Sequence, residues 1–137
     1  MNKLMMAVLF SVFLFLSGCC GFSEAIRGFA GVSTKILEDT RKDAVTKDFN
    51  IDLDSTRSII KAALKDGKSY IYREDHSCNL IAVYVSQTDT TPVGIFLTVL
   101  DKDNTRVEVS SPSTYGKEVI SKIIFNALEG SPDVKKQ

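Results

Sequence analysis

The sequence has no net charge. Seventeen basic residues balance seventeen acidic ones, and the basic residues are scattered along the chain. A nucleic-acid-binding surface needs clustered Lys and Arg side chains, so we expect no nucleic-acid partner. With 44% hydrophobic and 25% charged residues over 137 positions, the composition is that of a single globular domain.

Cysteine and histidine are also scarce. Three cysteines and one histidine are too few for a disulfide-rich scaffold, and His76 and Cys78 form the one pair that could bind a metal or supply a nucleophile. A zinc site takes three or four protein ligands, and no third group completes a catalytic triad here. We therefore predict no catalytic residue, no metal and no cofactor, and interpret the pair as a turn histidine beside a partly buried cysteine.

The hydrophobic run near the N-terminus is shorter than a membrane span. The run from Leu4 to Leu16 contains one polar residue, Ser11, and follows the single charge of Lys3. As a helix it would rise roughly 20 Å, whereas the hydrocarbon core of a bilayer is roughly 30 Å thick. A charged start followed by a short apolar stretch is typical of a secretory signal, so we expect residues 1–18 to be removed as a signal peptide.

The apolar run ends with Leu16, Ser17, Gly18 and Cys19. This segment resembles the lipobox of bacterial lipoproteins, in which the cysteine thiol takes a diacylglycerol as a thioether and becomes the new N-terminus. The resemblance implies that membrane lipid anchors the protein through Cys19, and that Cys20, in place of Asp, favours the periplasmic face of the outer membrane. The alternative is an uncleaved signal anchor in which both cysteines are small apolar residues.

Residues 19–43 are predicted to form the lipidated N-terminus and a tether. Apolar residues recur every three or four positions from Phe22 to Ile36, which favours an amphipathic helix, either lying on the membrane or packed on its own domain. If Cys19 is lipidated, Cys20 and Cys78 are the remaining pair of thiols. A bridge between them would pull the domain against the membrane, and the sequence leaves both the free and the bridged state open.

Residues 44–130 are predicted to form one domain, followed by a disordered tail at 131–137. A period of two from Val45 to Ile51 predicts a strand, and a stripe of apolar residues predicts a helix that Asp52 or Asp54 caps and Gly67 ends. Four further strands are expected at Ser69–Arg73, Leu80–Ser86, Val93–Leu100 and Thr105–Ser110. Ser113 or Thr114 caps a last helix that reaches Leu128.

Short connections between successive strands can only join antiparallel neighbours. We therefore predict an α+β fold of order β-α-β-β-β-β-α, with a mainly antiparallel five-stranded sheet and two helices on one face. Over roughly residues 43–129 the chain resembles a family of small uncharacterised bacterial lipoproteins, a domain of unknown function. The resemblance rests on the strand and helix of Val45–Gly67, on Thr105–Val109 and on Thr114–Gly116, which are packing and turn motifs and imply no activity.

Two further groups of side chains are candidate sites. Asp101, Asp103 and Asn104 lack the spacing of a calcium-binding loop and are interpreted as a hairpin turn. Tyr70, Tyr72 and Tyr84 could offer a stacking surface for sugar or peptide, but strands favour aromatic residues and packing is the preferred interpretation.

The preferred functional hypothesis is a non-enzymatic envelope lipoprotein that binds another envelope component, such as an envelope protein, with Phe96 and Leu100 as the candidate contact residues. Both alternations of the strand Val93–Leu100 are apolar, so a second apolar face of the sheet is expected opposite the helices. The competing interpretation is that Phe22–Thr40 folds back over this face. The alternative function is a small hydrolase or carbohydrate-active enzyme, which would need a pocket of converging polar groups.

Overall fold

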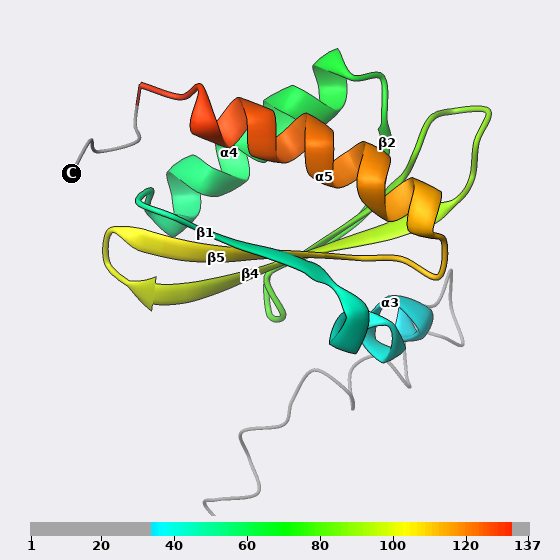
Figure 1. The fold of residues 1–137 in the computed structure, drawn as a ribbon, viewed down its shortest axis with the longest axis horizontal. Helices are drawn as coiled ribbons and strands as arrows, with labels where there is room; N and C mark the ends of the chain where they lie inside the picture. Colours follow the sequence, from blue (N-terminus) through cyan, green and yellow to red (C-terminus); the bar gives the residue numbers. More distant parts are fainter. Residues whose placement is uncertain (1–33, 133–137) are drawn as a thin grey trace, which may run out of the picture. The chain divides into compact units, whose positions relative to one another are not determined.

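A computed structural model describes residues 34–132 of the chain (Figure 1). The predicted signal peptide, the lipobox, residues 19–33 of the tether and the tail from residue 133 lie outside this range. The elements follow in the order α3 (Lys35–Asp39), the 3-10 helix η1 (Arg41–Asp43), β1 (Val45–Phe49), α4 (Leu53–Asp66), β2 (Tyr70–Asp75), β3 (Leu80–Tyr84), β4 (Pro92–Asp101), β5 (Asn104–Ser110) and α5 (Thr114–Glu129).

The five strands form one antiparallel sheet in the order β1-β5-β4-β3-β2. Strands β1 and β2 follow each other in the chain but form the two edges of the sheet, and α4 makes the connection between them. The predicted α+β class and the order β-α-β-β-β-β-α are therefore confirmed.

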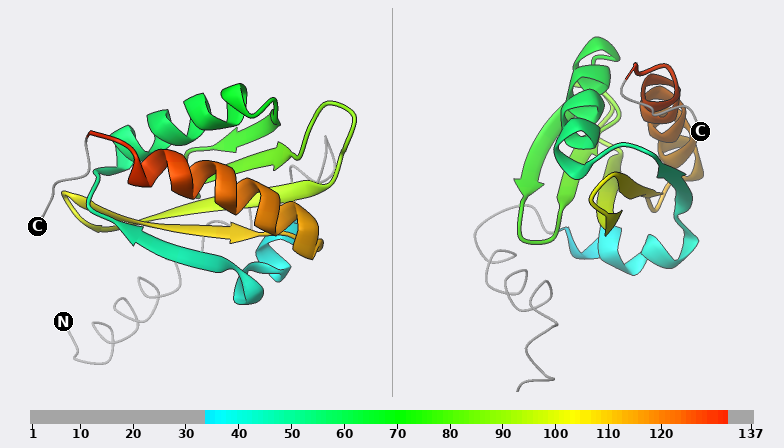
Figure 2. Two further views of the ribbon diagram at one scale, coloured as in Figure 1. Left: turned by 45° about the horizontal axis from the view of Figure 1, so that its top comes forward. Right: turned by 90° about the vertical axis from the view of Figure 1, so that its left-hand side faces the viewer.

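Helices α4 and α5 cover the same face of the sheet (Figures 1 and 2). Beneath them lies the main core, in which every second residue of the central strands meets the apolar stripes of the two helices. Its fully buried members include Ile60, Leu64, Val83, Val93, Ile95, Val107, Val109, Ile120, Ile124 and Leu128.

The opposite face of the sheet carries α3, whose only buried residue is Leu37 (Figure 2). Leu37 packs with Leu80, Ala82 and Phe96 in a second, smaller core, and its carbonyl accepts a 2.8 Å hydrogen bond from Ser110 Oγ. The compact unit accordingly begins at Thr34, upstream of the predicted boundary at residue 44, because the last part of the predicted tether packs on the domain.

Polar caps start both long helices. Asp52 accepts a 2.9 Å hydrogen bond from the Ser55 amide at the start of α4, and Ser113 accepts a 3.2 Å bond from the Gly116 amide at the start of α5. The backbone and hydroxyl hydrogen bonds from Ser55 hold the pKa of Asp52 below its ordinary value. The stabilising effect of Asp52 is therefore present above its ordinary pKa and is lost as the pH falls through the lowered one.

Ser113→Ala should lower the free energy of unfolding by about 1 kcal/mol, because it removes the side-chain acceptor for the first turn of α5. Urea denaturation measures the loss as a lower midpoint with an unchanged slope. Ser113→Asn restores a capping acceptor and should stay near the wild-type midpoint. Equal midpoints for the alanine variant and the wild type would show that this cap does not stabilise the helix.

Candidate functional site

The predicted contact pair Phe96 and Leu100 is separated by the fold. Phe96 is completely buried under Leu37, and the Arg41 guanidinium lies 4.4 Å from the centre of its ring. Arg41 is held there by a 2.6 Å ion pair with Glu108. Leu100 lies beyond this cover at the end of the β4–β5 hairpin and is 44% exposed. The expectation that Phe96 is an exposed contact residue is wrong, because α3 and η1 cover it.

His76 and Cys78 do not form a reactive pair. Cys78 is disulfide-bonded, so its sulfur is not available as a thiolate. The exposed His76 side chain has its Nε2 atom 3.9 Å from a Glu74 carboxylate oxygen, beyond hydrogen-bonding distance. Across residues 34–132, no three His, Cys, Asp or Glu side chains are grouped so that they could hold a metal ion.

Asp101 and Asn104 close the β4–β5 hairpin, as the turn interpretation predicts. One Asp101 carboxylate oxygen accepts hydrogen bonds from the Asn104 amide at 2.8 Å and from the Asp103 backbone at 2.9 Å. These bonds, led by that from the Asn104 side chain, lower the pKa of Asp101. The carboxylate of Asp101 is therefore used to fix the turn.

The three tyrosines of β2 and β3 pack against one another. The rings of Tyr72 and Tyr84 are 4.2 Å apart, and those of Tyr84 and Tyr70 are 6.3 Å apart, both pairs being stacked. Tyr84 therefore contacts both other rings, and Tyr70, which lies on the edge strand β2, is the most exposed of the three. These contacts are those of packing on a sheet surface.

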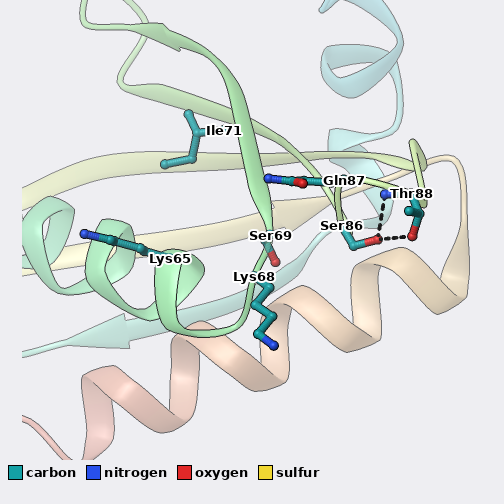
Figure 3. Close-up of a pocket in the computed structure, with 7 residues that line it drawn as sticks. All are labelled: Lys65, Lys68, Ser69, Ile71, Ser86, Gln87 and Thr88. Atoms are coloured by element: carbon teal, nitrogen blue, oxygen red, sulfur yellow. Dashed lines mark hydrogen bonds between the residues drawn. The ribbon is translucent and has the colours of Figure 1, made fainter.

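A pocket of about 530 Å³ lies where α4 ends, β2 begins and the β3–β4 loop passes (Figure 3). The backbone turns from helix into strand beside this pocket. Lys68 adopts the left-handed conformation with φ 58°, and the Ser69 amide donates a 2.9 Å hydrogen bond to the Leu64 carbonyl. The pocket is lined by Lys65, Lys68, Ser69, Ile71, Ser86, Gln87 and Thr88.

The β3–β4 loop forms a braced wall of this pocket. Ser86 Oγ accepts a 2.9 Å hydrogen bond from the Asp89 amide and a 3.2 Å bond from the Thr88 amide. Asp89 in turn accepts bonds from the hydroxyl and the amide of Thr91, which lower its pKa. Side-chain bonds of this kind fix a tight turn, so the loop presents Gln87 and Thr88 on a defined backbone.

Several polar groups of the pocket have no partner among residues 34–132. Lys65 and Lys68 make no side-chain ion pair with any residue of the described range, and Figure 3 shows their ammonium groups turned apart. Ser69 Oγ is buried without a hydrogen-bond partner among the same residues. The pocket therefore offers hydrogen-bond donors to a ligand that is rich in acceptors.

None of the seven lining residues belongs to a sequence pattern that predicts a site. Lysines, serines and threonines at the ends of helices and strands are typical of solvated turns. Residues 65–71 and 86–88 lie beside each other only in the folded chain. None of the lining residues is a histidine, a cysteine or an acidic residue, which are the residue types that most often mark a site in a sequence.

None of the helices in the described part of the chain is long and apolar enough to cross a membrane. No protein-family model matches the chain, and no curated protein matches it. The resemblance to the family of small bacterial lipoproteins thus stays a prediction from sequence motifs.

Proposed function

We propose that this chain is a lipid-anchored lipoprotein of the bacterial envelope whose domain binds another envelope component without catalysing a reaction. The lipobox Leu16–Cys19 at the end of a signal-like run supports the anchoring. Cys20 at the following position supports the periplasmic face of the outer membrane. Membrane lipid is then one partner, held covalently, and the bound envelope component is the other.

The pocket is the observation that carries the binding role. Its volume of about 530 Å³ falls within the usual range for small-ligand sites, about 300–1,000 Å³. Leaving a buried hydroxyl such as Ser69 Oγ without a partner costs about 1–3 kcal/mol, and a ligand acceptor would remove that cost. The ligand class that we expect carries oxyanions, phosphate or carboxylate groups, with one near each of the separate ammonium groups of Lys65 and Lys68.

The same lining favours binding over hydrolysis. Acyl and glycosyl transfer need a nucleophile within hydrogen-bond reach of a base. Among the described residues Ser69 Oγ has no hydrogen-bond partner, so it forms no such pair with Lys65 or Lys68. The pocket walls consist of lysine, serine, threonine, glutamine and isoleucine, so they position a ligand by donating hydrogen bonds. The hypothesis of a small hydrolase or carbohydrate-active enzyme gains no support from this geometry.

A photo-crosslinking amino acid at Gln87 should capture the bound component in cells that carry the full-length protein. The same probe at Lys102, on the exposed β4–β5 turn, is the matched control and should give no adduct. The double change Lys65→Ala and Lys68→Ala should reduce the Gln87 adduct more than tenfold, because each lost charged hydrogen bond is worth about 1.5–3 kcal/mol.

The double change Lys102→Ala and Lys122→Ala removes the same charge from other exposed positions and should leave the adduct unchanged. Equal capture at Gln87 and Lys102, or equal loss with both pairs of lysine variants, would reject the pocket as the binding site.

A further inference from the structure

Lys68 occupies a backbone position that suits glycine better than lysine. Its φ of 58° lies in the left-handed region, which a Cβ atom disfavours, so that glycine or asparagine usually takes this conformation at the end of a helix. Among the described residues, the other non-glycine residue with positive φ is Asn79, which is of the favoured type. Gly67 stands directly before Lys68 but has φ −75°, which any residue adopts. The turn therefore places a lysine side chain where it strains the backbone.

Ser69, the next residue, carries a second unfavourable feature. Its backbone amide is bonded to the Leu64 carbonyl, but its buried hydroxyl has no hydrogen-bond partner within residues 34–132. The residue as a whole is partly exposed and lines the pocket. A rotation about the Cα–Cβ bond moves a serine hydroxyl among three staggered positions. The hydroxyl can therefore turn toward an acceptor in the pocket without any movement of the backbone.

We infer that Lys68 and Ser69 are the specificity-determining residues of the pocket, and that both serve binding although both lower the stability of the free domain. This inference rests on the proposed binding function of the pocket. An oxyanion of the bound component pairs with the Lys68 ammonium and accepts the hydrogen bond of the Ser69 hydroxyl. A molecule without that acceptor leaves the hydroxyl unpaired and is rejected. Lys65 adds charge from the regular helix α4, where its backbone is unstrained.

Thermal melting of the full-length protein in detergent tests the two unfavourable features. Lys68→Gly should melt about 4 °C or more above Lys68→Ala, because glycine adopts positive φ without strain. At Lys65 the order should be reversed, because glycine weakens a helix relative to alanine. Ser69→Ala should melt above the wild type, since it removes an unpaired hydroxyl. Ser110→Ala is the matched control and should melt below it, because Ser110 Oγ has a partner in the Leu37 carbonyl.

The yield of the adduct formed by the photo-crosslinking amino acid at Gln87 tests the binding role in the same variants. Lys68→Gly and Ser69→Ala should each reduce the adduct about tenfold, because each removes a hydrogen bond to a charged group. Both variants should thus bind less while melting no lower than the wild type, which a purely structural role would not produce. Ser110→Ala should keep the wild-type yield.

The double change Lys65→Ala and Lys68→Ala separates this inference from the proposed function. If that variant lost the adduct while Lys68→Gly and Ser69→Ala kept it, the pocket would remain the binding site and the inference would be overturned. Wild-type yields in all three variants would reject both. A melting temperature of Ser69→Ala below that of the wild type would show that the hydroxyl stabilises the free domain, which also contradicts the inference.

Discussion

Ile124→Asp is expected to unfold the domain. Ile124 is 0% exposed on α5 and belongs to the main core beneath the two long helices. A carboxylate without a partner costs several kcal/mol in such a site, while whole domains are stable by only about 5–15 kcal/mol. Circular dichroism of the variant should show a cooperative transition lost or moved far below that of the wild type.

Lys122→Asp is the matched control on the same helix. Lys122 is exposed, so the same new carboxylate stays in water and should change stability by no more than about 0.5 kcal/mol. If Ile124→Asp melted at the wild-type temperature, α5 would not be packed on the sheet in solution.

Cys19→Ala is expected to abolish both lipidation and removal of residues 1–18. An alanine has no sulfur to form the thioether, so the variant should incorporate no labelled palmitate and should keep residues 1–18. Each acyl methylene removed from the bilayer forfeits about 0.8 kcal/mol, so loss of the lipid should eliminate stable anchoring through acyl chains.

Metabolic labelling followed by electrophoresis measures both the incorporation of palmitate and the size of the chain. Cys20→Ala is the matched control, because it changes the adjacent cysteine and should keep the wild-type label and processing. Palmitate incorporation into Cys19→Ala at the wild-type level would refute the lipobox assignment.

The main layers of this fold could be predicted because their patterns are local. The stripe from Val119 to Leu128 repeats at helical spacing, and short polar turns force antiparallel neighbours, so both helices and the sheet follow from the sequence. The edge strand β2 is less regular, because its register shifts between Ile71 and Arg73 and a period of two is lost there. The predicted strand therefore ends at Arg73, whereas the observed strand continues to Asp75.

The cover on the second sheet face depends on contacts that no local pattern contains. Both faces of β4 are apolar, which predicts that something covers each, but Leu37 can reach Phe96 only because Gly94 lies beneath it. A Cβ atom at Gly94 would come within 3.0 Å of Leu37 Cβ. Phe96 is thus buried by α3, which lies inside the segment Phe22–Thr40 that the competing interpretation placed over this face.

The pocket could not be predicted for a related reason. Its donors come from the end of α4, the start of β2 and a loop after β3, and each residue alone has the character of ordinary surface. The unpartnered state of Ser69 Oγ exists only in the folded chain, because burial of that atom depends on how the helix-to-strand turn meets the loop.

The hairpin of β2 and β3 separates the pocket from Cys78, since Ser69 and Ser86 lie at its open end and Cys78 lies in its closed turn. A strand such as Tyr70–Asp75 extends roughly 20 Å at about 3.3 Å per residue. The pocket and the turn that holds Cys78 are therefore at opposite ends of the same two strands, so a substitution at Cys78 should leave the lining of the pocket in place.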